Sequence, residues 1–355
     1  MDNESIDPVC GKHVNPEANT PSADCEGHRV YFCSRACREK FACHPEKRLA
    51  DYTYDLIIVG GGPAGMSAGI YAALTDIDTL LLTKSIGGQA WDSTRVVNYP
   101  GFEAIEGPQL VDRFQKQLFD DPKLVHKICE VTAIGKSRKT FRIRTDDGQT
   151  FRSQTVLLAM GMRRRRLPIP GEPEFRGKGV LEYHDLLAKQ YAGKDVAVVG
   201  GGNSAAQAAL GLAKRKARVR LVARSYRADS YLQEELAAQK EITILKGRDP
   251  VRLEGAERLE RLVVRNQETE EEEVLPVEAV FAEIGLIPNN ELVRELVILN
   301  ERGEVEIDRN CRTGLPGLYA AGDLTNTFGK RILIAAGEGA KAVLAVVEHL
   351  RGRAR

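Results

Sequence analysis

The chain has 355 residues, with 51 Lys or Arg and 50 Asp or Glu, so its formal net charge at pH 7 is +1. This length predicts two or three domains, and the balanced charge excludes an overall attraction to nucleic acid or to a membrane surface. The start, Met1-Asp2-Asn3-Glu4, lacks the basic and apolar regions of a secretory signal, and no stretch approaches the roughly 18 apolar residues of a membrane span. We therefore expect a cytoplasmic protein.

The first fifty residues differ in composition from the rest of the chain. Five of the seven cysteines and three of the six histidines lie there: Cys10, Cys25, Cys33, Cys37, Cys43, His13, His28 and His44. Such a shift marks a separate module, which we place at residues 1–50. Because a reducing cytoplasm opposes disulfides, the clustered thiols favour a metal site or catalytic thiols.

The order of residues in this module is also specific. Asp7-Pro8-Val9-Cys10-Gly11, then Tyr31-Phe32-Cys33, then Cys37 and Phe41, resemble a YHS domain, a small metal-binding module. Thiolates of Cys10, Cys33 and Cys37 would select zinc, copper or another thiophilic metal. The fourth ligand stays open among Cys25, Cys43, His28 and His44. Two roles are open: the metal only stabilises a module with little core, or the module presents a metal ion or a redox-active cysteine pair to the rest of the chain.

Two glycine-rich turns come next, Gly-Gly-Gly-Pro-Ala-Gly at residues 60–65 and Gly-Gly-Gly-Asn-Ser-Ala at residues 200–205. Each follows an apolar run, 54–59 or 195–199, that is typical of a buried parallel strand, and each precedes small residues that predict a helix. The first two motif glycines allow a tight turn and close approach to a pyrophosphate, and the third small residue lets the helix pack on the strand. Two such turns predict two dinucleotide sites and hence a redox enzyme.

Other motifs stand in a fixed order around these turns. They are Gly87-Gly88-Gln89, Ala159-Met160-Gly161, residues 284–289, the strand end Gly322-Asp323, and residues 330–339. In this order they resemble the low-molecular-weight thioredoxin reductase family over roughly residues 54–350. Within that family the similarity is greatest to the reductase portion of alkyl hydroperoxide reductase flavoproteins.

The resemblance implies an α/β fold of two Rossmann-like nucleotide-binding domains (three-layer ββα), with the NADPH domain inserted in a discontinuous FAD domain, and a homodimer. It implies FAD at the first turn, with Asp323 on the ribityl chain and Gln89 near the flavin edge. The FAD-binding residues that we expect are Gly60, Gly62, Pro63, Ala64, Gly65, Thr83, Gly88, Gln89, Asn98, Val131, Ala159, Gly161, Gly322, Asp323, Lys330, Arg331 and Ile332. Thr83 stands where the usual fingerprint has an acid.

The second turn would bind the nicotinamide nucleotide. An acid at the end of the second strand of such a unit would bind the ribose hydroxyls of NADH, and an arginine there would accept the 2′-phosphate of NADPH. The chain has Arg224 at that place, with Arg227 beyond it and no carboxylate, so NADPH is favoured over NADH unless Arg224 is only a surface charge. The predicted nucleotide residues are Gly200, Gly202, Asn203, Ser204, Ala205, Arg224 and Arg227.

Prolines and glycines predict where the chain passes between domains. The connector 167–171 and the segment at Pro288-Asn289 place FAD domain parts at 51–165 and 287–355, and the NAD(P)H-binding domain at 166–286. Four arginines, Arg163 to Arg166, precede the first connector. They are either a solvated face or a docking site for an acidic carrier such as ferredoxin or flavodoxin.

One expected feature is missing. Disulfide-reducing members of the family carry two cysteines, separated by two residues, before the second nucleotide-binding strand. This chain has Tyr183 and Leu186 at those places. Without sulfur the flavin cannot pass electrons onward by thiol exchange at this place. Ordinary thioredoxin reduction is therefore not expected, and the catalytic residue stays unknown, with Cys33, Cys37, Tyr183 and His184 as candidates.

Three functions remain open. The first is a flavoprotein that passes electrons from NADPH to a metal ion or thiol linked to the N-terminal cysteine module. The second is a reductase of a one-electron protein carrier, similar to the thioredoxin-reductase-like ferredoxin reductases. The third is a flavin-bound metal sensor or chaperone without sustained turnover.

Overall fold

The computed structural model describes residues 5–7, 13–16, 19–25, 28–35, 37–38, 52–93, 96–120, 124–181, 183 and 188–353. The chain divides into two compact units. The first unit comprises Met1–Met162 and Pro288–Arg355, and the second comprises Arg163–Ile287. The second unit is thus an insertion in the chain of the first.

A seven-stranded sheet forms the centre of the first unit. Its order is β7-β6-β5-β10-β9-β8, with β21 paired to β10. The parallel strands are β5 (Thr53–Gly61), β6 (Thr79–Ile86), β7 (Leu124–Ile128), β10 (Thr150–Leu158) and β21 (Leu318–Ala320). The strands β8 (Val131–Ser137) and β9 (Thr140–Thr145) form an antiparallel hairpin. Burial on both faces explains the unbroken apolar run of residues 56–59 in β5.

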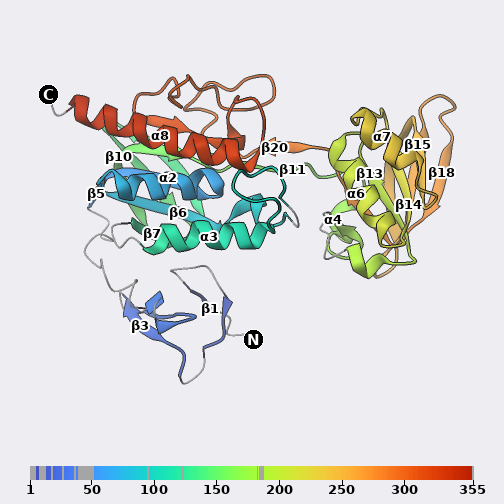
Figure 1. Cartoon of the computed structure of the whole chain (residues 1–355), viewed down its shortest axis with the longest axis horizontal. Coiled ribbons are helices and arrows are strands. Elements are labelled where there is room, and N and C mark those ends of the chain that lie inside the picture. The colour runs from blue at the N-terminus through green and yellow to red at the C-terminus, as the bar shows by residue number, and fades with distance from the viewer. Residues whose placement is uncertain are drawn as a thin grey trace. The chain divides into compact units, whose positions relative to one another are not determined.

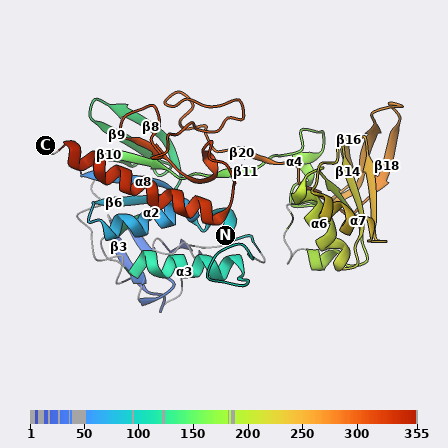
Figure 2. The same ribbon diagram turned by 45° about the horizontal axis from the view of Figure 1, so that its top comes forward.

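Helices cover one face of this sheet. They are α2 (Pro63–Leu74), α3 (Gly107–Asp120) and α8 (Ile332–Arg353), which lie in front of the sheet in Figures 1 and 2. Leu56 and Ile58 of β5 pack against these helices, whereas Ile57 and Val59 pack toward the β8–β9 hairpin on the other face. Alternation along one strand therefore builds two cores and a three-layer arrangement.

The second unit has a five-stranded parallel sheet of order β12-β19-β13-β14-β15. Its strands are β12 (Val180–Leu181), β19 (Ala279–Ala282), β13 (Asp195–Val199), β14 (Arg218–Ala223) and β15 (Ile242–Lys246). The helices α6 (Asn203–Lys214) and α7 (Ser230–Ala237) pack on one face. The antiparallel strands β16 (Arg248–Gly255), β17 (Leu259–Asn266) and β18 (Glu272–Pro276) contribute the core of the other face. Both units thus confirm the predicted fold class.

Shorter elements complete the described chain. Near the N-terminus β1 (Ser5–Ile6) pairs with β2 (His13–Val14), and β3 (Ser22–Cys25) pairs with β4 (His28–Tyr31). The strands β11 (Met162–Arg164) and β20 (Leu286–Pro288) pair where the chain passes between the units. Single turns of helix are η2 (Gly88–Ala90), α4 (Glu172–Phe175), η3 (Lys189–Tyr191) and η4 (Gly322–Leu324). No helix among the described residues is long and apolar enough to cross a membrane.

Candidate functional site

The first glycine-rich turn joins β5 to α2 at the carboxyl edge of the sheet. A side chain at Gly60, whose φ is +111°, would overlap the carbonyl oxygen of Ala159, and one at Gly65 would overlap the carbonyl oxygen of Gly60. At Gly62, by contrast, a Cβ would meet no protein atom within 4 Å. Packing therefore requires glycine at positions 60 and 65, whereas Gly62 faces open space.

The start of α2 is suited to a phosphate. Gly62 caps the helix without a side-chain hydrogen bond, Pro63 is its first residue, and no acidic residue lies in its first turn. The helix N-terminus therefore presents backbone donors and a partial positive charge beside the open space at Gly62. This cradle fits the pyrophosphate of a dinucleotide such as FAD.

Several predicted FAD residues gather around this turn. A Cβ at Gly88 would lie 3.2 Å from the Cα of Gly62, and Gln89 Nε2 donates to the carbonyl oxygen of Met162 at 2.6 Å. Ala159 follows β10 and contacts the turn directly. The Thr83 hydroxyl lies beside Gly61, but it donates to the carbonyl oxygen of Ser85 at 2.7 Å. A ribose of FAD bound at this place would have to share the Thr83 hydroxyl with the carbonyl oxygen of Ser85.

Other predicted FAD residues lie farther along the fold. Val131 is the first residue of β8 and is buried in the core on the face away from α2, and Asn98 is exposed in a loop. Gly161 accepts a hydrogen bond from the backbone N–H of Asn289 at 3.0 Å, which ties it to the segment after β20. Nothing in these contacts brings Val131 or Asn98 to the glycine turn.

The turn that carries Gly322 and Asp323 lies against the start of α2, because a Cβ at Gly322 would lie 3.0 Å from that of Ala64. Burial raises the pKa of the Asp323 carboxyl, the Lys330 charge lowers it, and the Glu338 charge raises it. Lys330 pairs with Glu304 at 3.0 Å and donates to the carbonyl oxygen of Thr325. Arg331 donates to the carbonyl oxygen of Lys330 at 2.8 Å, and Ile332 begins α8.

Sequence reasoning missed Glu338, a buried carboxylate on α8. It accepts hydrogen bonds from the backbone N–H of Gly322 at 2.8 Å, from the Thr325 hydroxyl at 3.3 Å, and from the Thr327 hydroxyl. All three donors belong to the loop that carries Asp323, so Glu338 ties this loop to α8. The signal in the sequence was a single acid among the small and apolar residues of 332–346.

The second glycine-rich turn joins β13 to α6 and repeats the geometry of the first. A Cβ at Gly200 would overlap the carbonyl oxygen of Glu283, whereas one at Gly202 would meet nothing within 4 Å. The Asn203 side chain exchanges hydrogen bonds with Asp229, Ser204 is exposed, and Ala205 is buried against the strands. This turn therefore also presents an uncapped helix start to open space.

The predicted arginines follow β14. The backbone N–H of Arg227 donates to the carbonyl oxygen of Gly201 at 2.7 Å, which brings the segment 224–227 against the turn. Arg224 is 75% exposed in its side chain, and its Nε donates to Asp249 Oδ1 at 2.5 Å. A carboxylate therefore stands beside the predicted phosphate-binding arginine, although none stands directly after β14 in the sequence.

Of the residues at the place of the missing cysteines, only Tyr183 is described. It is half-buried, and its ring meets that of Phe281 edge-on with centroids 6.1 Å apart. His184 and Leu186 lie outside the described residues. The surroundings of Tyr183 are those of a packed core side chain of the second unit.

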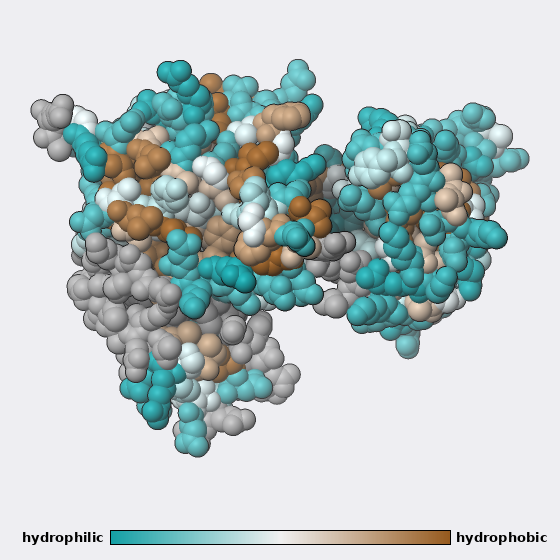
Figure 3. Space-filling model, in the orientation of Figure 1, coloured by the Kyte–Doolittle hydropathy of each residue, from teal (hydrophilic) through white to brown (hydrophobic). Residues whose placement is uncertain are grey.

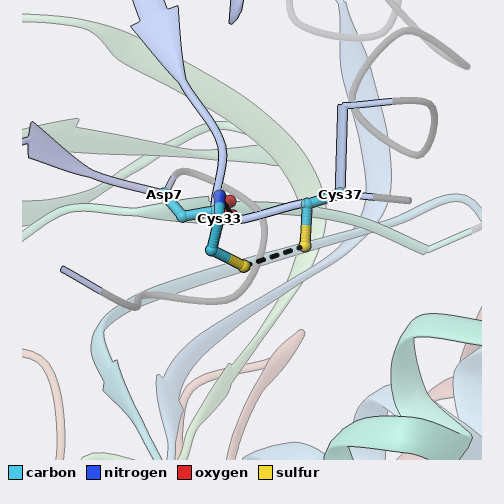
Figure 4. Close-up of side chains that lie close together, drawn as sticks. All are labelled: Asp7, Cys33 and Cys37. Atoms are coloured by element: carbon cyan, nitrogen blue, oxygen red, sulfur yellow. Dashed lines mark hydrogen bonds between the residues drawn. The ribbon is translucent and has the colours of Figure 1, made fainter. Parts of the chain in front are cut away.

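In the N-terminal module, Asp7, Cys33 and Cys37 form one cluster (Figure 4). Their ligand atoms all lie within 4.8 Å of one another, and the sulfur atoms of Cys33 and Cys37 are 3.7 Å apart. Asp7 is fully buried and accepts the backbone N–H of Cys33 at 2.7 Å. Burial raises the pKa of the Cys37 thiol to about 11, the hydrogen bond with Ser34 lowers it, and the Asp7 charge raises it.

Two thiols and a carboxylate are a donor set that fits a thiophilic divalent ion such as zinc, which would bind the thiols as thiolates. Asp7 was quoted in the sequence motif but was not among the expected ligands. The third expected ligand, Cys10, lies outside the described residues, as do Cys43 and His44. The side chains of Cys25 and His28 are likewise outside the description.

Comparisons with known proteins agree with this architecture. Residues 54–342 match the family model described as pyridine nucleotide-disulphide oxidoreductase, and residues 5–50 match the model of the YHS domain. The chain is 35% identical over 310 residues to the F subunit of alkyl hydroperoxide reductase from Pseudomonas putida, a match that covers 86% of this chain and 60% of that protein. The chain thus spans about three fifths of the length of that relative.

Two further relatives match over nearly their whole length. A 34.2 kDa protein in the rubredoxin operon of Clostridium pasteurianum is 33% identical over 303 residues, which are 84% of this chain and 98% of that protein. The crystal structure of thioredoxin reductase from Lactococcus lactis aligns with a TM-score of 0.78 and 31% identity, over 84% of this chain and 100% of that one.

Proposed function

The chain belongs to the pyridine nucleotide-disulphide oxidoreductase family and is an NAD(P)H-dependent flavoprotein oxidoreductase, and from this premise we propose that it passes electrons from NADPH to a metal ion or thiol bound by its N-terminal cysteine module. The observation that carries the proposal is the Asp7, Cys33 and Cys37 cluster. It lies in a YHS domain, on a chain that has Tyr183 and Leu186 where disulfide reductases of this kind have cysteines.

FAD would bind along the first glycine-rich turn. When bound, it supplies the chemistry of accepting a hydride and releasing electrons. The start of α2 would neutralise the pyrophosphate, and the open space at Gly62 leaves room for its approach. Asp323 would accept from the ribityl hydroxyls, and Glu338 would fix the loop in which Asp323 lies.

NADPH would bind at the second turn in the same manner. The start of α6 and the open space at Gly202 would receive its pyrophosphate. Arg224 and Arg227 would bind the 2′-phosphate, because guanidinium groups pair well with phosphate oxygens. The protein's task is to orient the two rings and to exclude oxygen from them.

At the N-terminal module the residues themselves would bind the acceptor. A reducible thiophilic ion such as copper would bind Cys33 and Cys37 as thiolates and could accept electrons there, whereas zinc has no redox chemistry and would only stabilise the module. Asp7 would act either as a third ligand or by fixing the backbone of Cys33, to which it is hydrogen-bonded. Without a metal, a disulfide between Cys33 and Cys37 would be the acceptor, and two electrons would reduce it to two thiols.

An anaerobic titration of the purified protein with NADPH, followed by flavin absorbance, tests the proposal. We expect about two molecules of NADPH to be consumed per FAD, because a second centre in the module must be reduced as well. The double variant Cys33→Ser, Cys37→Ser should need about one NADPH per FAD, and Arg35→Ala, an exposed neighbour, should still need two. Consumption of one NADPH per FAD by the unaltered protein would exclude electron exchange with the module. Flavin reduction without steady NADPH consumption with any acceptor would instead identify a metal sensor or chaperone.

A second candidate is the reduction of a small one-electron carrier, such as a ferredoxin or flavodoxin. The relative encoded in a rubredoxin operon and the arginines at 163–166 favour it. Arg163, Arg165 and Arg166 are exposed, whereas Arg164 pairs with Glu283. An acidic carrier bound by these arginines would be reduced more slowly as salt is raised. Replacing the three exposed arginines with glutamine should remove that salt dependence, and an unchanged dependence would exclude this docking site.

We also propose that the protein acts as a homodimer. Apolar side chains are exposed on α2 and α8: Tyr71, Leu74, Leu333 and Leu344. Brown patches lie over these helices in Figure 3, whereas the visible surface of the second unit is mostly hydrophilic. Such a surface is suited to a second copy of the chain. Light scattering of Leu74→Glu, Leu344→Glu would show monomers if these helices form the interface, and dimers if they do not.

A further inference from the structure

Two oppositely charged side chains meet at the carboxyl edge of the second unit's sheet. Arg224 is the residue after β14, and Asp249 comes three residues after β15, past the turn at Gly247. Because β14 and β15 are parallel neighbours, these strand ends lie at the same edge of the sheet. The glycine-rich turn lies at that edge too, since Arg227 donates to Gly201 and a Cβ at Gly201 would overlap the carbonyl oxygen of Ser225.

Asp249 is the better fixed of the two. Its Oδ1 accepts from Arg224 Nε at 2.5 Å and its Oδ2 accepts from Gln267 Nε2 at 2.9 Å. The Asp249 side chain is 30% exposed, against 75% for Arg224. Although partial burial raises the pKa of Asp249, hydrogen bonds from Gln267 and Arg224 lower it to below its usual value. A carboxylate that is ionised at neutral pH therefore stands beside the arginine at this edge of the sheet.

The two residue types select opposite nucleotides. A carboxylate at this edge accepts hydrogen bonds from the ribose hydroxyls of NADH and repels a 2′-phosphate, whereas an arginine attracts that phosphate. We propose that Asp249 is a specificity-determining residue: its negative charge repels a 2′-phosphate that Arg224 attracts, weakens the preference for NADPH, and lets NADH serve as a second electron donor. The inference rests on the proposed nucleotide site of the second unit.

The ion pair itself does not block Arg224. An exposed pair of this kind is weak, so the guanidinium can turn from Asp249 to a phosphate. The negative charge of Asp249 stays in place, however, because Gln267 also binds it. The 2′-phosphate of NADPH brings up to about two negative charges at pH 7. The discrimination between NADPH and NADH therefore comes from repulsion between this phosphate and the fixed carboxylate, and not from loss of the ion pair.

The test compares Asp249→Asn with a matched variant, Asp195→Asn. Asp195 pairs with Arg218 at 2.5 Å and with Arg220 at 3.2 Å, but it begins β13 and so lies at the opposite edge of the same sheet. The full-length protein is titrated with NADP+ and with NAD+ by calorimetry, and kcat/KM is measured with NADPH and NADH. The asparagine side chain has the size of the aspartate that it replaces and can still meet Gln267, so the fold should survive.

We expect Asp249→Asn to raise the ratio of NADP+ to NAD+ affinity by about three- to tenfold, because one repulsive charge is removed near a partly screened phosphate. Asp195→Asn should leave the ratio within about twofold, and Arg224→Gln should lower it about tenfold or more, since it removes the attracting charge. Comparable kcat/KM values for NADPH and NADH in the unaltered protein are expected as well.

An unchanged ratio in Asp249→Asn would overturn the proposal. A lowered ratio would also overturn it, because it would mean that Asp249 orients Arg224 toward the phosphate. If neither nucleotide binds the unaltered protein or any variant, the assignment of the nucleotide site is wrong. That result is distinct from an unchanged ratio of affinities. The binding measurement does not depend on the acceptor, so an error about the cysteine module would leave the test intact.

Discussion

Glu338 offers the sharpest test of the first site at the level of a single residue. Replacing it with alanine would leave the backbone N–H of Gly322 and the hydroxyl of Thr327 without this acceptor, whereas the Thr325 hydroxyl would keep its hydrogen bond to the carbonyl oxygen of Gly322. An unpaired buried donor costs about 1–3 kcal/mol, and the loop would be free to move away from α8. We therefore expect Glu338→Ala to weaken FAD binding by about 10- to 100-fold.

The measurement is the FAD dissociation constant, from flavin fluorescence during titration of apoprotein. Glu348→Ala is the matched control, because Glu348 lies on the same helix, is 75% exposed and forms an ion pair with Arg312 at 3.7 Å on the surface. Glu338→Gln keeps one acceptor oxygen and should restore part of the affinity. Equal affinity in Glu338→Ala and the unaltered protein would show that the loop does not contribute to the cofactor site.

The cysteines should differ strongly in reactivity. Burial raises the pKa of Cys129 to about 12 and that of Cys311 to about 12, whereas Cys33 is exposed. Because the thiolate is the reactive form, iodoacetamide at pH 8 should modify Cys33 and leave Cys129 and Cys311 unmodified, as mass spectrometry of the peptides would show. Zinc should protect Cys33 without affecting the other two. Rapid labelling of Cys129 in the native protein would contradict the burial.

At this scale the sequence was informative only where a residue acts through its own neighbours in the chain. The glycine motifs were identifiable because turn geometry is local. Glu338 and Asp249 were not, because each acts through a partner 16 or 25 residues away, on another element. Asp249 in particular reaches the end of β14 from the strand after β15, a place that only the pairing of strands defines.

At the level of the elements, the two glycine turns allow the two nucleotide sites to be separated. Gly62 and Gly202 both have negative φ, of −74° and −101°, and open space where a Cβ would lie. Alanine at either position should therefore leave the apoprotein's melting temperature within about 2 °C, since no protein atom is displaced. The added methyl groups would instead meet the pyrophosphates.

We expect Gly62→Ala to lower the FAD content of the purified protein severalfold, and Gly202→Ala to raise KM for NADPH about tenfold or more while the FAD content is unchanged. Gly65→Ala is the contrasting variant, because its side chain would overlap the Gly60 carbonyl and should lower the stability of the fold itself. FAD loss in Gly202→Ala, or normal FAD content in Gly62→Ala, would contradict the assignment of the turns.

Elements were predictable where periodicity and motif agreed. The runs 54–59 and 195–199 became β5 and β13, because continuous apolar residues suit strands that are buried on both faces. The strands β16, β17 and β18 pair with their neighbours in the chain, whereas the pairing of β11 with β20 joins segments that are far apart in the chain. Periodicity within one segment does not contain that information.

At the scale of the whole molecule, the buried cores of the two units share no residue within the described part of the chain. Two hydrophobic clusters draw only on the first unit, and two others only on residues of 163–287. The order of the motifs predicted this insertion, because the motif that closes the FAD site follows the second nucleotide motif. A unit with its own cores can open without its neighbour, so each ligand should stabilise the unit that binds it.

Hydrogen exchange would test this independence. NADP+ at about 100 times its dissociation constant stabilises the binding unit by roughly 2.7 kcal/mol, which slows globally opening amides about 100-fold. We expect NADP+ to slow amide exchange in β13 and β14 and to leave exchange in β5 and β10 unchanged. The variant Gly202→Ala should abolish the effect of NADP+. FAD added to apoprotein should slow β5 and β10 instead. Protection of both sets of strands by NADP+ alone would mean that the units open together, and the separate cores would then not behave as separate folding units.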